Sequence, residues 1–137
     1  MTNEAYATTA AVSKRALWTG RILSGLVVLF LLFDAVVHIL KPSQVVEAFG
    51  QLGFSLGTAV PLGIIELILI ALYLIPRTSV FGAILLTGYL GGAISAQLRI
   101  GAPLFGNVLF PLYVALFVWG GLWFRDLRLR ALIPLSA

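Results

Sequence analysis

The chain has 137 residues, of which 61% are hydrophobic and only 10% are charged, with a formal net charge of +4 at pH 7. Soluble domains are nearer half apolar and one quarter charged, so this composition excludes a water-facing globular surface and indicates membrane residence. The absence of cysteine excludes disulfides, thiolate metal sites and dithiol relays.

In chain order, residues 1–13 are predicted to form a disordered tail, and four strongly apolar runs follow. A helix needs about 20 apolar residues to cross the hydrocarbon core, and helices satisfy their backbone groups there. The runs that qualify are residues 17–40, 57–75, 80–98 and 104–124. We therefore predict an all-α, integral-membrane four-helix bundle over residues 14–126, followed by a basic tail at 127–137 that lies along the membrane surface.

The connection between the first two spans is long enough for a short interfacial helix. Apolar residues recur there near helical spacing, Pro42-Ser43 is a suitable start and Gly53 a suitable end. Such a segment either packs over the mouth of the bundle or acts as a mobile lid.

Basic residues are distributed unequally between the two sides of the predicted bundle. Of nine, only Lys41 and Arg99 lie in the first and third connections. The seven others, at the two ends of the domain and in the second connection, are Lys14, Arg15, Arg21, Arg77, Arg125, Arg128 and Arg130. The positive-inside rule therefore places both termini in the cytoplasm, and Trp18, Trp119 and Trp123 form an aromatic belt at that interface. This charge pattern explains the basic composition without a nucleic-acid partner.

Strongly polar residues lie in the spans only at the membrane midplane or on the outer side of it. A charge in hydrocarbon costs at least about 2.5–3.5 kcal/mol, so such residues usually face a protein-lined or watery cavity. The predicted ligand-binding residues are Asp34, His38, Glu66, Tyr89, Gln97, Arg99 and Asn107. They predict a pocket that faces outward, with Glu66 near its floor and a dry, apolar inner half below it.

Each of these residues also has a purely structural interpretation. His38 and Arg99 can extend their polar groups to the outer interface. Asp34 can be a neutral acid bonded to a neighbouring helix, whereas Glu66 is too deep to reach water easily. As a functional set, the residues can exchange a proton or bind the polar head of an amphipathic ligand. Nothing in the spacing of Asp34, His38 and Glu66 is specific to a metal ion, so no metal site is predicted.

The third span carries a series of small residues, Gly88, Gly92 and Ala96. Small residues allow helices to approach closely in lipid. The series favours close packing within the chain, and a homodimer contact is the alternative.

Three segments resemble the DoxX-like family of small four-helix bacterial membrane proteins: residues 63–67 (GIIEL), 74–93 (LIPRTSVFGAILLTGYLGGA) and 123–126 (WFRD). The resemblance implies a multi-pass protein of the bacterial cytoplasmic (inner) membrane and a link to quinone-dependent redox or oxidative-stress systems. The family's intramembrane glutamate corresponds to Glu66 and its outer-end base to Arg99. Relatives often have histidine at the positions of Gln97 and Asn107, and the amides here keep hydrogen bonding but not proton transfer or strong metal ligation.

Three functions remain open at this point. The leading one is a membrane subunit that binds a quinone or a similar amphipathic molecule, with electrons carried by that ligand or by a redox partner. The second is a non-enzymatic assembly or stabilising partner of a larger membrane complex. The third is a pathway for protons or small solutes. None of these establishes that the protein is an enzyme.

Overall fold

The computed structural model describes residues 11–135, and helices make up most of this range. The elements are α1 (Lys14–Leu40), α2 (Ser43–Leu52), η1 (Leu56–Thr58), α3 (Ala59–Leu74), α4 (Ser79–Arg99), η2 (Leu104–Val108), α5 (Phe110–Arg125) and α6 (Leu127–Leu132). Four stretches are long and apolar enough to cross a membrane: α1, η1 with α3, α4, and η2 with α5. The predicted all-α four-helix bundle is therefore confirmed.

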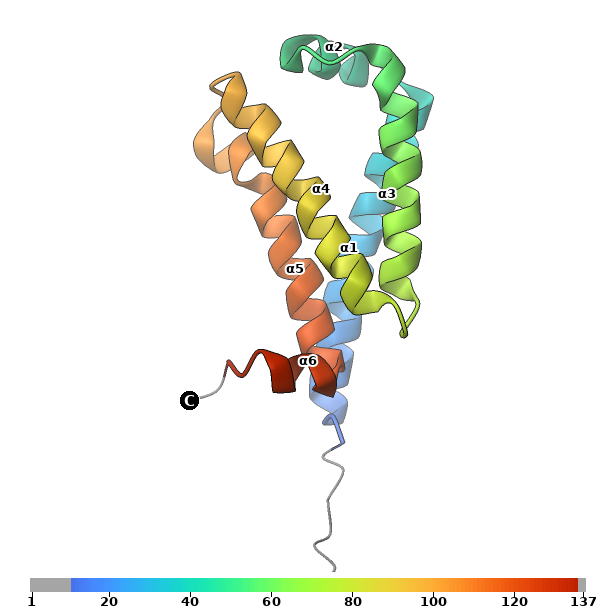
Figure 1. Cartoon of the computed structure of the whole chain (residues 1–137), viewed down its shortest axis with the longest axis vertical. Coiled ribbons are helices and arrows are strands. Elements are labelled where there is room, and N and C mark those ends of the chain that lie inside the picture. Colours follow the sequence, from blue (N-terminus) through green and yellow to red (C-terminus); the bar gives the residue numbers. More distant parts are fainter. Residues whose placement is uncertain (1–10, 136–137) are drawn as a thin grey trace, which may run out of the picture.

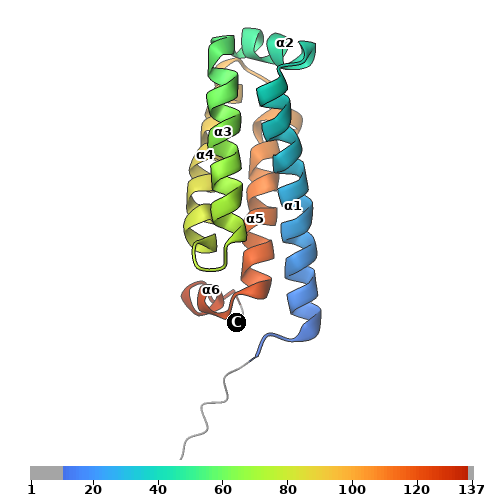
Figure 2. The same cartoon turned by 90° about the vertical axis from the view of Figure 1, so that its right-hand side faces the viewer.

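The four long helices form a closed ring in which α1 packs along α3 and α5, and α4 packs along the same two helices. The α1–α3 pair and the α4–α5 pair diverge toward α2, whereas α6 crosses the opposite end of the bundle (Figures 1 and 2). We refer to these as the α2 end and the α6 end. Both ends of the described chain lie at the α6 end. Residues 1–10 of the predicted tail lie outside the described residues.

Local signals in the sequence set where the helices begin and end. Ser13 caps α1 by accepting a hydrogen bond from the amide of Ala16, at 3.2 Å. Lys41 ends α1 in the left-handed conformation, with φ 51°. The short helix predicted between the first two spans is confirmed as α2, which begins at Ser43 and is capped after Leu52 by Gly53, with φ 72°.

The packed core occupies the α6 half of the bundle, where aliphatic side chains from all four long helices meet. Leu31, Leu86, Val118 and Leu122 are among its most buried members. A separate small cluster of Val45, Phe49 and Ala59 lies beneath α2. The α6 half is therefore closed by side chains, as the apolar sequence there predicts.

A buried polar chain also crosses this half, and the sequence did not indicate it. Arg125 Nε donates to Ser24 Oγ (3.1 Å), Ser24 Oγ lies 2.9 Å from Tyr73 Oη, and Tyr73 Oη donates to the Val118 carbonyl (2.8 Å). Since the tyrosine proton goes to Val118, the serine proton goes to the tyrosine oxygen, and every hydroxyl in the chain both donates and accepts. The inner half was predicted to be almost entirely aliphatic, aromatic or glycine, and these hydrogen bonds cross it as an addition to that pattern.

Replacing Tyr73 with phenylalanine is expected to lower the free energy of unfolding by about 1–3 kcal/mol, because Ser24 loses its buried acceptor. Thermal unfolding in detergent measures the effect. Tyr113→Phe is the matched control, since the Tyr113 hydroxyl donates to the Phe105 carbonyl at the surface and its loss is expected to change little. Equal melting temperatures for the two variants would contradict a stabilising role for the buried chain.

The close contact of α1 with α5 uses small residues that differ from the predicted series. A Cβ atom at Gly20 would lie 2.7 Å from the Gly121 carbonyl, and one at Gly121 would lie 2.8 Å from the Ser24 amide nitrogen. In contrast, a Cβ atom at Gly88 or Gly92 would meet nothing within 4 Å. Close packing of α4 through those two glycines is therefore not found in the described chain, and other glycines mark the close helix contacts.

Candidate functional site

A cavity of about 650 Å³ lies at the α2 end, bounded by α1, α2, α3, α4, η2 and α5. Six of the seven residues predicted to bind a ligand line it: Asp34, His38, Glu66, Tyr89, Gln97 and Asn107. They come from four different elements, so only the folded bundle brings them together. The remaining wall is mainly apolar and includes Phe30, Leu62, Phe110 and Val114.

Asp34 and His38 form a pair on one face of α1, because residues four apart lie one helical turn from each other. His38 Nδ1 is 2.8 Å from the backbone oxygen of Asp34 and 3.3 Å from its carboxylate Oδ2. The edge of the Phe49 ring in α2 packs against the imidazole, with 5.6 Å between ring centroids. These contacts hold the imidazole between α1 and α2.

Glu66 is placed opposite this pair by a close approach of α3 to α1. A Cβ atom at Gly63 would lie 2.7 Å from the Ala35 carbonyl, so the absence of a side chain there lets the two helices meet. Glu66 follows one turn later on the same face of α3. The helix contact therefore sets the position of the carboxylate relative to Asp34 and His38.

The Glu66 side chain is fully buried, and its two oxygens differ in their surroundings. Tyr89 Oη donates to Oε2 at 3.3 Å. Oε1 has no hydrogen-bond partner among the described residues. A buried acceptor without a partner costs about 1–3 kcal/mol, and more when it is charged, so Oε1 is a candidate atom for contact with a ligand.

Arg99 is not among the residues that line the cavity. Its guanidinium donates to the Leu52 carbonyl at the end of α2 and lies 5.8 Å above the ring of Phe54. Arg99 therefore ties the end of α4 to the end of α2. Through this contact it holds α2 across the side of the cavity that Val45, Phe49 and Leu52 line.

Sequence reasoning missed Gly88 and Gly92 as cavity residues. Both line the cavity, and both lack a side chain where a larger residue would extend into open space. The four-residue spacing of these glycines was visible in the sequence, but it was interpreted as a signal for close helix packing and not for a cavity. The aromatic pair of Phe30 and Phe110, whose ring centroids are 5.3 Å apart, was also missed because aromatic residues are common throughout the spans.

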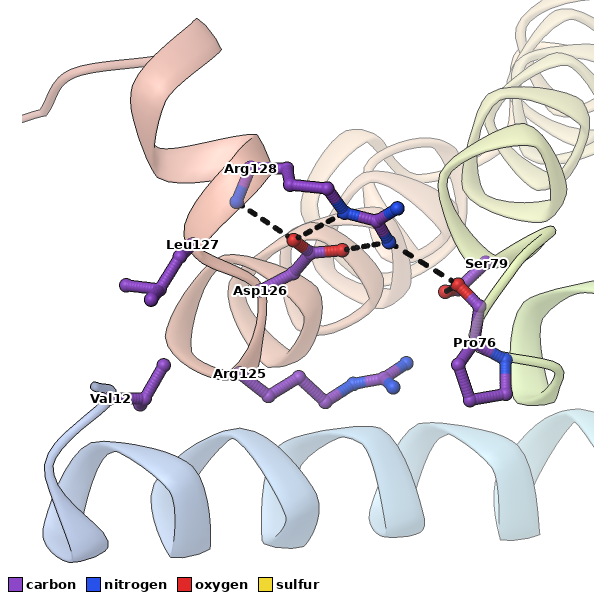
Figure 3. A pocket seen from close by; sticks show the side chains of 7 residues that line it. All are labelled: Val12, Pro76, Ser79, Arg125, Asp126, Leu127 and Arg128. Carbon is purple, nitrogen blue, oxygen red and sulfur yellow. Dashed lines mark hydrogen bonds and ion pairs between the residues drawn. The ribbon is translucent and has the colours of Figure 1, made fainter. Parts of the chain in front are cut away.

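A second cavity, of about 360 Å³, lies at the α6 end, where α6 meets the connection between α3 and α4 (Figure 3). Asp126 begins α6 by accepting from the amide and the guanidinium of Arg128, and Arg128 also reaches the Pro76 carbonyl. Partial burial raises the pKa of Asp126, but the hydrogen bonds and charge of Arg128 outweigh it, and the net pKa is below the usual range. The Asp126 carboxylate is therefore ionised near neutral pH and holds α6 in place.

The arrangement as a whole defines a helical membrane bundle that is packed at one end and has a polar-lined cavity at the other. The sequence model of the DoxX-like family matches residues 22–121, which is most of the chain and all four spans in large part. The protein belongs to the DoxX-like family. None of the curated proteins and none of the solved structures with which it was compared matches it.

Proposed function

We propose that this protein binds a quinone or a similar amphipathic molecule in the cavity at the α2 end, as a subunit of a membrane redox or stress-response system. The observation that carries the proposal is that six predicted polar residues share one cavity whose other walls are mainly apolar. Small-molecule sites have typical volumes of about 300–1,000 Å³, mostly apolar walls and a few convergent polar groups. The cavity has each of these properties.

The polar side chains supply what a quinone head group needs. Its carbonyl oxygens accept hydrogen bonds, and the Tyr89 hydroxyl, the His38 imidazole and the amides of Gln97 and Asn107 are potential donors. The carboxyl groups of Asp34 and Glu66 can exchange protons with the head group. The electrons are carried by the quinone and a redox partner, because the chain has no cysteine for redox chemistry of its own.

The apolar part of the molecule would lie against the aromatic and aliphatic wall. Phe30 and Phe110 are both substantially exposed, and both line the cavity. Gly88 and Gly92 leave room beside them. This division into a polar and an apolar part favours an amphipathic ligand over a small hydrophilic one.

The distribution of basic residues supports one orientation of the bundle in the membrane. Seven of nine belong to the α6 end of the bundle and two, Lys41 and Arg99, to the α2 end. By the positive-inside rule the α6 end faces the cytoplasm, so the cavity faces the outside of a bacterial inner membrane. A pathway through the bundle is disfavoured, because Leu86, Val118 and Leu122 are fully buried in the α6 half.

The proposal predicts that filling the cavity removes the ligand. Gly92 lines the cavity, and a Cβ atom there would meet no protein atom within 4 Å. The bundle of Gly92→Leu is therefore expected to fold while ligand retention falls at least about tenfold, or 1.4 kcal/mol. Protein purified in mild detergent is extracted with organic solvent, and quinones and lipids are quantified per chain by mass spectrometry. Added decylubiquinone measures binding directly.

Gly91→Leu is the matched control, since Gly91 is the adjacent residue of α4, is equally open and does not line the cavity. It is expected to retain the ligand at the wild-type level, and Glu66→Gln is expected to retain less. Absence of any lipid-soluble ligand and of decylubiquinone binding in the wild type would sink the proposal. Copurification of a defined protein partner instead would favour an assembly role.

A further inference from the structure

The side chains of Asp34, His38 and Glu66 converge closely enough to share one small ligand. Each offers one donor atom, and these three atoms all lie within 4.8 Å of one another. Two come from consecutive turns of α1 and the third from α3, at the point where Gly63 lets the helices meet. Their spacing along the chain did not indicate a metal, but their proximity in space does.

The unpartnered oxygen of Glu66 is a second, independent observation. The Glu66 side chain is fully buried, lines the cavity and has no hydrogen-bond partner for Oε1. Tyr89 orients the carboxylate through Oε2, which leaves Oε1 as the available donor atom. A carboxylate that ligates a metal is commonly oriented by a hydrogen bond to its other oxygen. Glu66 has this arrangement, with one oxygen held by Tyr89 and the other without a partner.

Charge balance supports a cation at the same place. Among the described residues, the ion pairs are those of His38 with Asp34 and of Arg128 with Asp126, so Glu66 has no cationic partner of its own. Buried charges are usually paired or coordinate metals. A divalent ion would neutralise both carboxylates and leave the imidazole neutral, as a metal ligand requires.

We propose that Asp34, His38 and Glu66 bind one divalent transition-metal ion, such as Zn²⁺ or Mn²⁺, at the floor of the cavity. Mixed carboxylate and imidazole donors suit these ions, whereas an all-oxygen set would favour Ca²⁺ or Mg²⁺. Donors at about 2.0–2.2 Å from a tetrahedral zinc ion lie about 3.3–3.6 Å from each other, so side-chain rotations must bring the three atoms about 1 Å closer than their present limit of 4.8 Å. Tyr89 is then a positioning residue for Glu66. With the ion bound, the amides of Gln97 and Asn107 are the groups left to donate to the amphipathic molecule.

Zinc binding to the full chain in lipid nanodiscs tests the proposal. After treatment with a chelator, the protein is dialysed against Zn²⁺, and bound zinc per chain is measured by mass spectrometry. We expect one tightly bound Zn²⁺ in the wild type. Loss of a residue that only supports a metal ligand usually lowers the affinity by about 10–100-fold, so a larger loss is expected in the three ligand variants, Asp34→Asn, His38→Gln and Glu66→Gln. Tyr89→Phe is expected to weaken binding about tenfold.

Glu47→Gln is the control, because Glu47 is an exposed acid on α2 outside the cluster. Mn²⁺ provides a second readout, since the electron paramagnetic resonance signal of the free ion is lost on binding and returns when Zn²⁺ displaces it. His38→Gln keeps the test valid if Glu66→Gln misfolds, because His38 is only partly buried. No zinc binding in the wild type, or binding unchanged in the three ligand variants, would overturn the proposal.

This proposal and the proposed function can fail separately. Gly92→Leu fills the cavity from α4, which supplies none of the three donors, so it is expected to lose the amphipathic molecule and to keep Zn²⁺. If Gly92→Leu loses both the amphipathic molecule and Zn²⁺, the proposal that the metal site is independent of the apolar part of the cavity is overturned.

Discussion

Replacing Gly121 with alanine is expected to destabilise the bundle by about 3 kcal/mol, at the upper end of the usual cost of overpacking. The added Cβ would lie 2.8 Å from the backbone nitrogen of Ser24, closer than real Cβ contacts allow. Because a helix backbone cannot turn aside as a side chain can, α1 must move away from α5. That movement would also break the hydrogen bonds from Arg125 to Ser24 and from Ser24 to Tyr73.

The measurement is thermal unfolding in detergent, where this loss corresponds to a fall in melting temperature of roughly 10 °C for a chain of this size. Gly120→Ala is the matched control on the same helix, because its Cβ would meet only Leu23 Cδ1, at an ordinary distance of 3.8 Å. It is expected to be neutral or slightly stabilising, since alanine is the better helix former. A Gly121→Ala variant as stable as Gly120→Ala would contradict the close contact of α1 with α5.

The elements of this fold could be predicted because their signals are local. The hydrophobic length of each span and the features that bound α2, Ser43 at its start and Gly53 at its end, are read within a few residues. The contact of Gly20 with Gly121 joins positions that are distant in the chain, and many glycines in the spans were equally plausible candidates. The series at Gly88 and Gly92 showed the expected spacing for packing, yet the divergence of the helix pairs at the α2 end leaves those glycines open.

The candidate site could be predicted in part because depth in a membrane follows from position along a straight helix. With a rise of about 1.5 Å per residue, Asp34, Glu66 and Gln97 could all be placed in one half of the bundle. Rotation about each helix axis is not fixed in this way. That Glu66 faces Asp34, whereas Arg99 turns to α2, depends on contacts between helices. The buried chain through Tyr73 depends on the same contacts.

Replacing Glu66 with methionine is expected to stabilise the protein, although it removes the central residue of the site. In chelator-treated, ligand-free protein, Glu66 is a buried carboxyl group whose Oε1 has no hydrogen-bond partner, and methionine has a similar length without that cost. A buried acceptor without a partner costs about 1–3 kcal/mol, and an apolar residue of similar volume removes that cost. We therefore expect a gain of about 1–3 kcal/mol in unfolding free energy.

Thermal unfolding of the chelator-treated protein tests this, with Glu47→Met as a control that should stay within about 0.5 kcal/mol because Glu47 is exposed. The gain is expected to disappear or reverse when saturating Zn²⁺ is added, because only the wild type is then stabilised by binding. A less stable Glu66→Met variant in the absence of metal would mean that the bond from Tyr89 outweighs the unpartnered oxygen. Glu66 would then be a structural residue. If the variant is instead more stable and binds neither ligand, the carboxyl group of Glu66 lowers the stability of the protein and serves to bind the ligand.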